Sequence, residues 1–380
     1  MVNDPANLRT AAPPAPERCA SAASVSASPA SAAPTSAQST TMPSGLRLCV
    51  AVPTFRRPEQ LETLLQGIAR QTLPEAIALE VVVFDNDVRP SAQAVVDAAR
   101  AWFPFSLDYV RVAQPGLATV RNAIVDYARG HFDFVAMIDD DESPQLHWLS
   151  ELVRVQGLTG ADAVIGPVPQ LIPDDAPRWL RAGSFFDLPV HPDAASIDFG
   201  YSGNCLLAVR SLERFGVTFD TALDFAGGED LVFFRQLLAR GAKINFAARA
   251  VAYERVGKER LNAGYLLRLN FRRGNTLALC DRRGNALALG DRLGNTLAPG
   301  AQQGSMLAPE RRGAKFRALA LRAGKATARL GLGALALIPL AIGRGRTGAM
   351  LALCAVAHGL GGLCGITGYT YQAYRRDDPS

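Results

Sequence analysis

The 380-residue sequence has no CxxC pair among its six scattered cysteines. Cysteines spaced in this way indicate neither a zinc site nor a disulfide framework, and they fit a reducing compartment. No serine or cysteine has a recognisable histidine partner, so no motif indicates covalent catalysis. The formal net charge of +5 is small and its excess lies late in the chain, which argues against a nucleic-acid binder and favours contact with an anionic membrane surface.

Residues 1–45 contain almost no large apolar side chains and consist mainly of Ala, Ser, Pro and Thr. Such a segment cannot bury enough surface to offset the entropy lost on ordering. It also lacks the uninterrupted apolar core of a secretory signal. We therefore predict a disordered extension that is not a secretory signal.

Apolar stretches of strand length then alternate with amphipathic stretches of helix length. The sequence predicts strands over residues 46–52, 79–84 and 107–112, and helices over residues 59–71 and 92–102. Because each strand is apolar throughout, we expect a parallel sheet that is covered on both faces. Right-handed crossovers would bring the carboxyl ends of these strands to one common edge.

A further apolar strand, within residues 132–142 (FDFVAMIDDDE), ends in four consecutive carboxylates. Buried strands do not carry unpaired charge, so the acids are expected to emerge at the strand's carboxyl end, into solvent or onto a cation. In extended chain Asp139 and Asp141 would point the same way, which suits one divalent ion shared with phosphate oxygens. The alternative is a helix start before Pro144, which one acid would suffice to cap.

Two more polar clusters follow neighbouring strands: Pro53, Thr54 and Arg56 after the first, and Asp85 and Asp87 after the second. If the strands are parallel, these clusters share one edge with the acid run. Such an edge is where open α/β sheets bind ligands.

A helix is predicted to start at Gly116, within residues 114–122 (QPGLATVRN). Its first turns carry Arg121 and Asn122. Backbone donors at a helix start together with a guanidinium form a cradle for a diphosphate.

The turn of Gly227 and Gly228 precedes Glu229 and Asp230 at another predicted helix start. A carboxylate held on a rigid helix start can act as general base and contribute about 10²–10⁴-fold to the rate. The alternative is structural, because acids in the first turn of any helix are favoured by its dipole.

Several of these stretches together, VAVPTFRRP, VVVFDND, GLATVRNAIV, FVAMIDDDE, SGNCLLAVR and GGEDLVFFRQLLARGAKI, resemble family 2 glycosyltransferases of the GT-A fold. The resemblance covers residues 46–275 and is greatest to bacterial exopolysaccharide transferases of the succinoglycan type. It implies an α/β fold with a mostly parallel sheet between helices, followed here by a C-terminal apolar helical tail.

The resemblance also implies the roles of site residues. Asp230, with Glu229 beside it, would be the catalytic base, and Asp141 with Asp139 would hold a divalent metal, Mn²⁺ or Mg²⁺. The nucleotide sugar would be bound by Pro53, Thr54, Arg56, Asp85, Arg121, Asn122, Asp139 and Asp140. Many relatives carry a metal-approaching His after the last core strand, whereas this chain has Tyr253 and Glu254. Glu254 is an alternative oxygen ligand.

Trp179, Phe185 and Phe186 lie between the acid run and the GGED turn. Aromatic side chains in this place either stack on a sugar ring or belong to the core, and the sequence leaves both alternatives open.

Ten-residue units beginning with RRGNTLALCD at residue 272 recur in tandem to residue 311. Their period matches none of the known solenoid repeats, which run from about 20 to 50 residues. We interpret residues 272–311 as a tolerated repeat insertion, with a basic arm for lipid phosphate as the alternative.

Two apolar segments follow the basic residues 311–329. Residues 330–342 are short for a bilayer span, which needs ~20 residues, whereas residues 348–368 are long enough. A single span, a re-entrant or two-span hairpin and an interfacial anchor remain open, with a hairpin buried in the soluble fold as the further alternative.

These observations predict a disordered extension (1–45), a GT-A catalytic domain (46–271), a repeat insertion (272–311) and a membrane-associating tail (312–380). The expected activity is inverting sugar transfer from a nucleotide-diphosphate sugar, UDP first, to a glycan or lipid-linked acceptor in surface or extracellular polysaccharide synthesis. The expected location is the cytoplasmic face of the inner membrane. The alternatives are an inactive nucleotide-sugar-binding scaffold and a sugar-phosphate nucleotidyltransferase.

Overall fold

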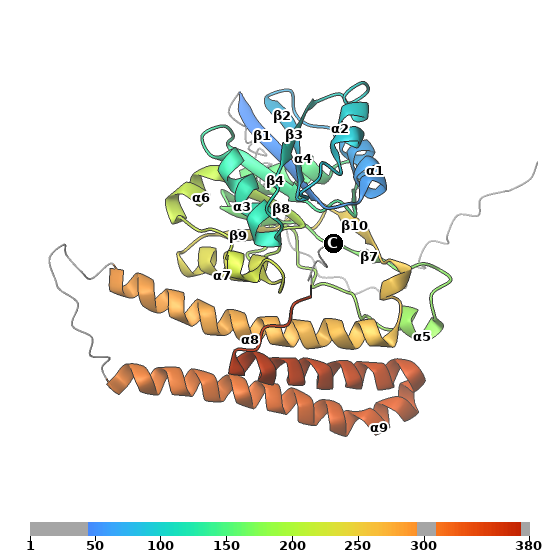
Figure 1. The fold of residues 1–380 in the computed structure, drawn as a ribbon, viewed down its shortest axis with the longest axis vertical. Coiled ribbons are helices and arrows are strands. Elements are labelled where there is room, and N and C mark those ends of the chain that lie inside the picture. Colours follow the sequence, from blue (N-terminus) through green and yellow to red (C-terminus); the bar gives the residue numbers. More distant parts are fainter. Residues whose placement is uncertain (1–44, 295–308, 374–380) are drawn as a thin grey trace, which may run out of the picture. The chain divides into compact units, whose positions relative to one another are not determined.

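The computed structural model describes residues 45–294 and 309–373, and their side chains except those of residues 282–319 and 322. Its centre is a seven-stranded sheet in the order β3-β2-β1-β4-β8-β6-β9 (Figure 1). The strands are β1 (Leu46–Thr54), β2 (Ile77–Asp85), β3 (Ser106–Arg111), β4 (Phe134–Ile138), β6 (Ala163–Ile165), β8 (Asn204–Ala208) and β9 (Ile244–Phe246).

The four strands β1 to β4 are mutually parallel, as predicted, because helical crossovers connect them. Strand β8 is antiparallel to both of its neighbours, β4 and β6, while β9 is again parallel to β6. The predicted mostly parallel α/β fold is thereby confirmed.

Alternate residues of β1 serve two separate cores, as the two-residue period of a strand requires. Leu48, Val50 and Val52 face one core, and Cys49 and Ala51 face the other. The first core is covered by α1 (Pro58–Ile68), α2 (Gln93–Ala99) and α4 (Trp148–Thr159), and the second by α3 (Leu117–Ala128), α6 (Val209–Phe215) and α7 (Glu229–Ala239).

A second, three-stranded sheet has the order β5-β10-β7. It joins β5 (Glu142–Pro144), β10 (Ala252–Arg255) and β7 (Gln170–Leu171), and the sequence did not predict it. Strand β5 begins at the last carboxylate of the acid run, so this small sheet brings Glu254 opposite Glu142. The remaining short elements are α5 (Arg178–Arg181), η1 (Thr221–Leu223) and η2 (Lys258–Arg260).

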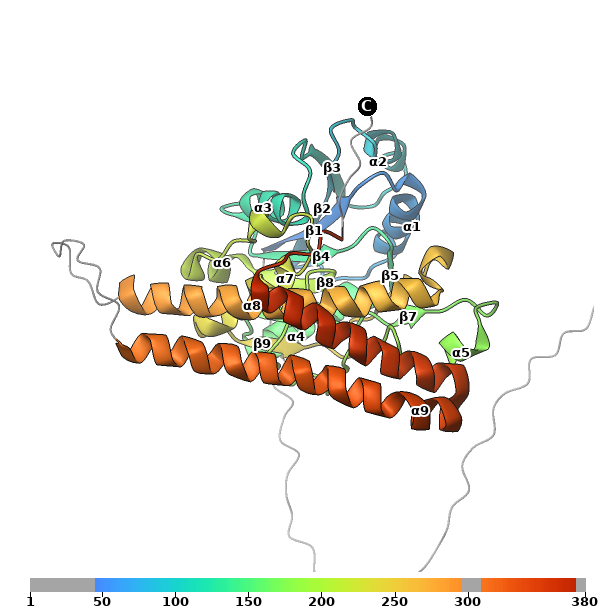
Figure 2. The same cartoon turned by 60° about the horizontal axis from the view of Figure 1, so that its bottom comes forward.

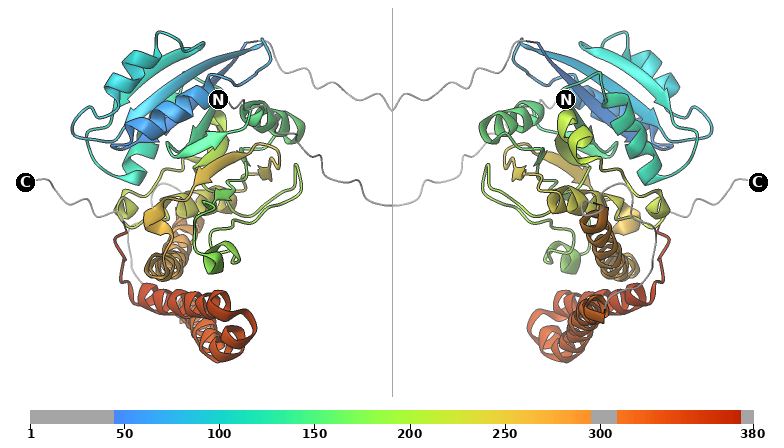
Figure 3. Two further views of the ribbon diagram at one scale, coloured as in Figure 1. Left: turned by 90° about the vertical axis from the view of Figure 1, so that its right-hand side faces the viewer. Right: turned by 90° about the vertical axis from the view of Figure 1, so that its left-hand side faces the viewer.

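Two long helices end the described chain, α8 (Ala263–Gly294) and α9 (Pro309–Thr367). Gly345 has φ 56 and ψ −137, which breaks α9 into an outer arm (residues 309–344) and an inner arm (residues 346–367). The inner arm lies between α8 and the outer arm (Figures 1 and 2), and Figure 3 shows the same three helices from the side.

Helix α8 runs through the first two decapeptide units and into the third. The rest of the repeat up to residue 308 lies outside the described residues, as does the predicted disordered extension up to residue 44. The five cysteines within the described part of the chain are all free thiols.

Candidate active site

The acid run lies at the carboxyl end of β4, and the register of the sheet explains its contacts. Ala51 of β1 pairs with Met137 of β4, so three residues further along Thr54 comes opposite Asp140. The Thr54 hydroxyl donates a 2.8 Å hydrogen bond to Asp140. Burial raises the pKa of Asp140, and the nearby Arg57 guanidinium opposes that rise.

Strand β4 ends at Ile138, so Asp139, Asp140 and Asp141 lie in a turn and not in extended chain. The expected alternation, with Asp139 and Asp141 pointing the same way, is therefore not the arrangement found. Arg57 Nη1 lies 2.8 Å from both Asp140 and Asp141 and bridges the two adjacent acids.

The fourth acid, Glu142, is buried, although the sequence predicted that the acids would emerge into solvent or onto a cation. Its Oε2 atom has no hydrogen-bond partner. Burial, followed by the charges of Asp139, Asp141 and Glu254, raises the pKa of Glu142 well above its usual value. Four carboxyl groups therefore concentrate here, and Glu142 was not among the predicted site residues.

Gly203 makes room for this concentration. A Cβ atom at residue 203 would lie 2.7 Å from Glu142 Oε1 and 3.0 Å from Asp139 Oδ2. Gly203, just before β8, thus lies against two of the acids.

Arg260 and Glu254 close the other side of the acid cluster. Arg260 Nη1 lies 2.5 Å from Glu254 Oε1, and Arg260 Nη2 lies 3.7 Å from Asp141 Oδ2. Because η2 carries Arg260 immediately after β10, the short second sheet delivers both side chains to the site. Nothing in the sequence pattern identified Arg260.

The GGED turn reaches the acid run through Arg121. Helix α7 begins at Glu229, after Gly228 in the left-handed region with φ +89. Arg121 Nη1 donates to the buried Glu229 carboxylate, and its Nη2 lies 3.7 Å from Asp139 Oδ1. Glu229 Oε2 has no hydrogen-bond partner. Asp230, the next residue, is partly exposed.

Asp85 is fully buried and its carboxylate is already bound by the protein. It accepts hydrogen bonds from Ser91 Oγ, the Ala92 amide and the Tyr109 hydroxyl at 2.8–2.9 Å. Burial and this hydrogen bond raise the pKa of Tyr109. Asp85 therefore fixes the loop in the region that is predicted to bind the nucleotide sugar.

Arg56 is half-exposed, and its Nε atom pairs with Asp87 Oδ2 at 2.6 Å. Pro53, the last residue but one of β1, is only partly buried. Asn86, which the sequence analysis did not single out, donates to Val112 O and Gln114 O and accepts from the Gly116 amide. Its three hydrogen bonds tie the ends of β2 and β3 to the start of α3.

The start of α3 at Gly116 is confirmed, but its first-turn donors are engaged. The Asp224 carboxylate accepts 2.8 Å hydrogen bonds from the Thr119 amide and hydroxyl. Asn122 exchanges two hydrogen bonds with the backbone of Phe219. Of the predicted diphosphate cradle, only Arg121 reaches the acid cluster.

Phe185 and Phe186 belong to a core cluster with α8 and α9 residues, so the core alternative is the arrangement found. Trp179 packs at the edge of this cluster, with its ring against Phe185.

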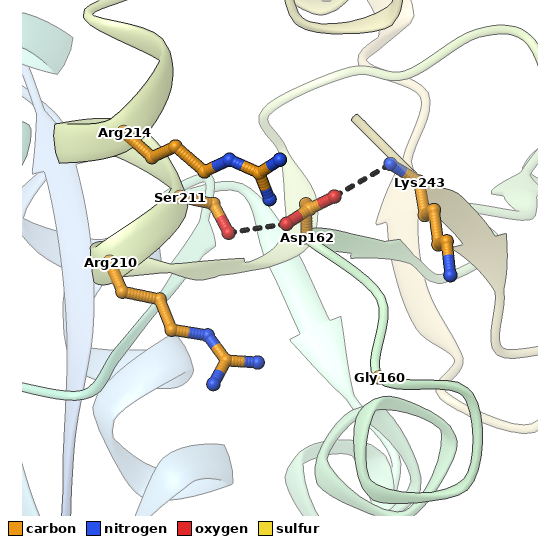
Figure 4. Close-up of a pocket in the computed structure, with 6 residues that line it drawn as sticks. All are labelled: Gly160, Asp162, Arg210, Ser211, Arg214 and Lys243. Carbon is orange, nitrogen blue, oxygen red and sulfur yellow. Dashed lines mark hydrogen bonds between the residues drawn. The ribbon is translucent and has the colours of Figure 1, made fainter. Parts of the chain in front are cut away.

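A separate pocket of about 270 Å³ is lined by Gly160, Asp162, Arg210, Ser211, Arg214 and Lys243 (Figure 4). Ala208 of β8 pairs with Phe134, the first residue of β4, and the Ala208 amide donates to Asp162 O. This pocket therefore lies at the amino end of β4, whereas the acids lie at its carboxyl end. Asp162 is bound by Ser211 Oγ at 2.5 Å and by the Lys243 amide at 2.7 Å (Figure 4). This pocket is thus separate from the place where the acids converge.

The acid cluster has the donor chemistry of a divalent-metal site. Carboxylate oxygens are the ligands that Mg²⁺ and Mn²⁺ favour, and the unpartnered Glu142 Oε2 leaves a buried acceptor among them. Across residues 45–294 and 309–373, no three acidic, His or Cys side chains are already grouped closely enough to hold a metal. Arg57 and Arg260 are paired with Asp141 instead.

The chain was compared with known proteins and structures. A model of glycosyl transferase family 2 matches residues 49–216. The succinoglycan biosynthesis protein ExoM of Rhizobium meliloti is 38% identical over 232 residues, which are 61% of this chain and 74% of ExoM.

Among solved structures, the mannosyltransferase PcManGT from Pyrobaculum calidifontis, in complex with GDP-Man and Mn²⁺, has a TM-score of 0.52 at 20% identity. The match covers 85% of this chain and 88% of PcManGT, and it shows the GT-A fold. S. aureus TarS has a TM-score of 0.43 at 17% identity; the match covers 61% of this chain and only 42% of TarS. The identity to ExoM and the family match together show that the chain belongs to glycosyl transferase family 2.

Proposed function

We propose that the chain transfers a sugar, with inversion, from a nucleotide-diphosphate sugar to a glycan or lipid-linked acceptor in surface or extracellular polysaccharide synthesis. The name of ExoM, a succinoglycan biosynthesis protein, supports a polysaccharide product. The GDP-Man and Mn²⁺ bound by PcManGT support a nucleotide-sugar donor and a metal. UDP is the first nucleotide to test, because the family resemblance implies it.

The observation that carries this proposal is the position of Arg121. Its guanidinium pairs with Glu229 at the start of α7 and lies within 3.7 Å of Asp139 after β4. One side chain therefore connects the GGED turn to the acid run, which are ninety residues apart in sequence. Asp230 is the partly exposed carboxylate next to this junction, and we assign it the role of general base.

Glu229 has a different task from Asp230. It is buried and ion-paired, so it anchors the first turn of α7, on which Asp230 is the next residue. A single base that faces the anomeric carbon opposite the departing diphosphate gives inversion of configuration. The acceptor hydroxyl gives its proton to Asp230 as the new glycosidic bond forms and the bond to the diphosphate breaks.

Asp139, Asp141, Glu142 and Glu254 are the oxygen donors that would hold a divalent metal. When bound, such a metal stabilises the departing diphosphate by neutralising charge that develops on it. Arg57 and Arg260, which pair with Asp141, are assigned to contact the diphosphate as well. Thr54, Arg56, Asp85 and Asp140 are assigned to nucleotide binding.

Calorimetry tests the donor site directly. We expect one of UDP, GDP and dTDP to bind in the presence of Mn²⁺ or Mg²⁺, and we expect Asp141→Ala to lose that binding. Asp97→Ala is the matched control, because Asp97 is an exposed acid on α2 that pairs with Arg100. No nucleotide binding by folded protein under any metal condition would refute the transferase proposal.

Turnover separates the base from the binding residues. Asp230→Asn keeps the size and polarity of the side chain but cannot accept the proton. We expect it to bind nucleotide as the wild type does and to lose at least about 10²-fold in kcat. A variant with unchanged kcat would remove Asp230 from the catalytic role.

We further propose that the enzyme works at the cytoplasmic face of the inner membrane, where a lipid-linked acceptor would be present. One helical segment of the described chain, Ala323–Thr367, is long and apolar enough to cross a membrane.

A further inference from the structure

The inner arm of α9 is packed tightly against α8. A Cβ atom on Gly361 would clash with the carbonyl oxygen of Phe271, and one on Gly274 would clash with that of His358. Two helix backbones can approach this closely where a small residue such as glycine has no side chain between them. Asn275 of α8 is buried, donates to Tyr369 O at 2.9 Å and accepts from the Tyr371 amide at 3.0 Å.

The opposite side of the inner arm is covered by the outer arm. Cβ atoms on Gly359 and Gly333 would lie 2.8 and 2.9 Å from the backbone oxygens of Ala326 and Ala352. The two arms are antiparallel, because the earlier residue of the outer arm, 326, lies against the later residue of the inner arm, 359, and residue 333 lies against residue 352. The inner arm is therefore enclosed between two helices of its own chain (Figures 1 and 2).

Helix α8 is in turn fixed to the GGED helix α7. Arg235 and Asp281 form a 2.5 Å ion pair, and Cys280 Sγ donates to Gly228 O. Because α8 lies along the catalytic domain and the inner arm lies along α8, the inner arm runs beside the domain and does not project from it. The segment that is long enough for a bilayer span, residues 348–368, is thus packed against other helices of the same chain.

The outer arm has the more exposed apolar face, whereas the exposed large apolar side chains of the inner arm, Leu353 and Leu360, are 36 and 44% exposed. Leu332, Leu335, Ile338 and Ile342 are 67, 78, 70 and 81% exposed. Their spacing of three, three and four residues places them on one side of the helix. Pro339, in the middle of this face, does not interrupt the helix.

The charges around this face are of one sign. Lys325 and Arg329 are exposed before it, and Arg344 and Arg346 are exposed after it, at the turn into the inner arm. Residues 311–373 contain no aspartate or glutamate. An apolar stripe with cations at both ends matches an anionic phospholipid surface, in which acyl chains lie beneath negative headgroups.

We propose that the outer arm lies in the plane of an anionic phospholipid surface as an interfacial helix, while the inner arm stays inside the protein and does not span the bilayer. This inference deepens the membrane location proposed above and does not depend on transferase activity. It also fits the length of the apolar segment, since the 13 residues 330–342 extend only ~20 Å at ~1.5 Å per residue.

Vesicle co-sedimentation of the full chain tests the surface. We expect binding to phosphatidylcholine vesicles that contain phosphatidylglycerol, and at least about tenfold weaker binding to phosphatidylcholine alone. Leu335→Glu with Ile342→Glu should abolish binding, and Arg344→Gln with Arg346→Gln should remove the preference for anionic vesicles. The matched control is Val88→Glu with Leu158→Glu, two similarly exposed apolar residues of the catalytic domain, which should bind as the wild type does.

Cysteine labelling distinguishes an in-plane helix from a span. In membranes from expressing cells, we expect an impermeant maleimide to label Arg344→Cys from the same side as Asp97→Cys on the catalytic domain, in a background with Cys19→Ser and Cys364→Ser. Labelling of position 344 only from the opposite side would show a spanning hairpin and overturn the proposal. If Leu335→Glu with Ile342→Glu instead converts a dimer to a monomer and leaves vesicle binding unchanged, the face joins two copies and the proposal is wrong. Nucleotide binding measured on the same variants shows separately whether the donor site is intact.

Discussion

Loss of Arg121 should leave a buried carboxylate without its counter-charge. The side chains of Arg121 and Glu229 are 8 and 3% exposed, so neither charge is compensated by water. Removing one partner of a buried ion pair costs about 3–5 kcal/mol. We therefore expect Arg121→Met to lower the unfolding free energy by about 4 kcal/mol, or the melting temperature by ~10 °C for a domain of this size.

Urea and thermal unfolding of four proteins measure this effect: wild type, Arg121→Met, Glu229→Gln and the double variant. The double variant removes both charges and should recover at least half of the loss, which gives a large coupling energy in the cycle.

Arg129→Met is the matched control, since Arg129 pairs with Asp126 near the other end of the same helix with side chains 33 and 67% exposed. Exposed pairs contribute ~0.2–1 kcal/mol. A cost in Arg121→Met no larger than that of the control, or strictly additive single losses, would refute the assignment of this pair as the link between the GGED turn and the acid run.

Three further outcomes are expected. Gly228→Ala should lower the free energy of unfolding by about 1–3 kcal/mol, because φ is +89 at this residue and the new Cβ would clash with Thr276. Urea unfolding measures this loss. Gly241→Ala is the control that isolates the clash, because Gly241 has φ +90 but its Cβ would lie in open space. Burial, then the charges of Arg329 and Arg273, lowers the pKa of His358 to about 4, so below pH 6.5 the unfolded chain takes up a proton that the folded chain does not. Stability should fall as the pH drops from 6.5 to 4, by about 1–2 kcal/mol after allowance for partial exposure, and a wild-type pH profile identical to that of His358→Gln would contradict this. Deletion of residues 282–301 in register should leave nucleotide binding and turnover unchanged, and loss of activity in the folded variant would end the interpretation of the repeats as a tolerated insertion.

The parallel strands β1 to β4 of the main sheet were predictable from apolar stretches, whereas β6 and β9, of three residues each, were not predicted. Strands β1, β2 and β3 and the helices between them fall within a few residues of the predicted bounds. The second sheet was not predictable, since β5, β7 and β10 are only two to four residues long and have no pattern of their own. Glu254 could be named as an alternative ligand, but its pairing opposite Glu142 depends on that sheet.

The sequence analysis named Asp139, Asp141 and Arg121, which the fold brings together, but it did not single out Glu142, Arg57 or Arg260. Carboxylates that follow an apolar strand are visible in sequence, whereas Arg57 and Arg260 resemble any surface cation until the fold brings them to Asp141. Asp224 is 105 residues away from Thr119, and no local signal indicates that it binds the start of α3. The roles of the site residues stay predictions until they are measured.

Length and the lack of charge favoured residues 348–368 over residues 330–342 as a membrane span. These properties do not show which segment the rest of the chain covers, and of the two segments residues 330–342 carry the most exposed apolar side chains. The glycines that weaken the later segment as a span are the same ones that let it pack against α8.

The close packing of Gly274 and Asn275 has a consequence for how the decapeptide can multiply. Ten residues of α-helix fall about 80° short of three full turns, so each added unit presents its Gly-Asn pair to a different direction. Gly-Asn occurs in three units of the sequence. Because successive pairs face different directions, a continuous helix α8 can place only one pair against the inner arm at a time. Units can therefore be added or removed after the first without creating a second packing site for the inner arm. On this argument the packing of the inner arm does not fix the number of units.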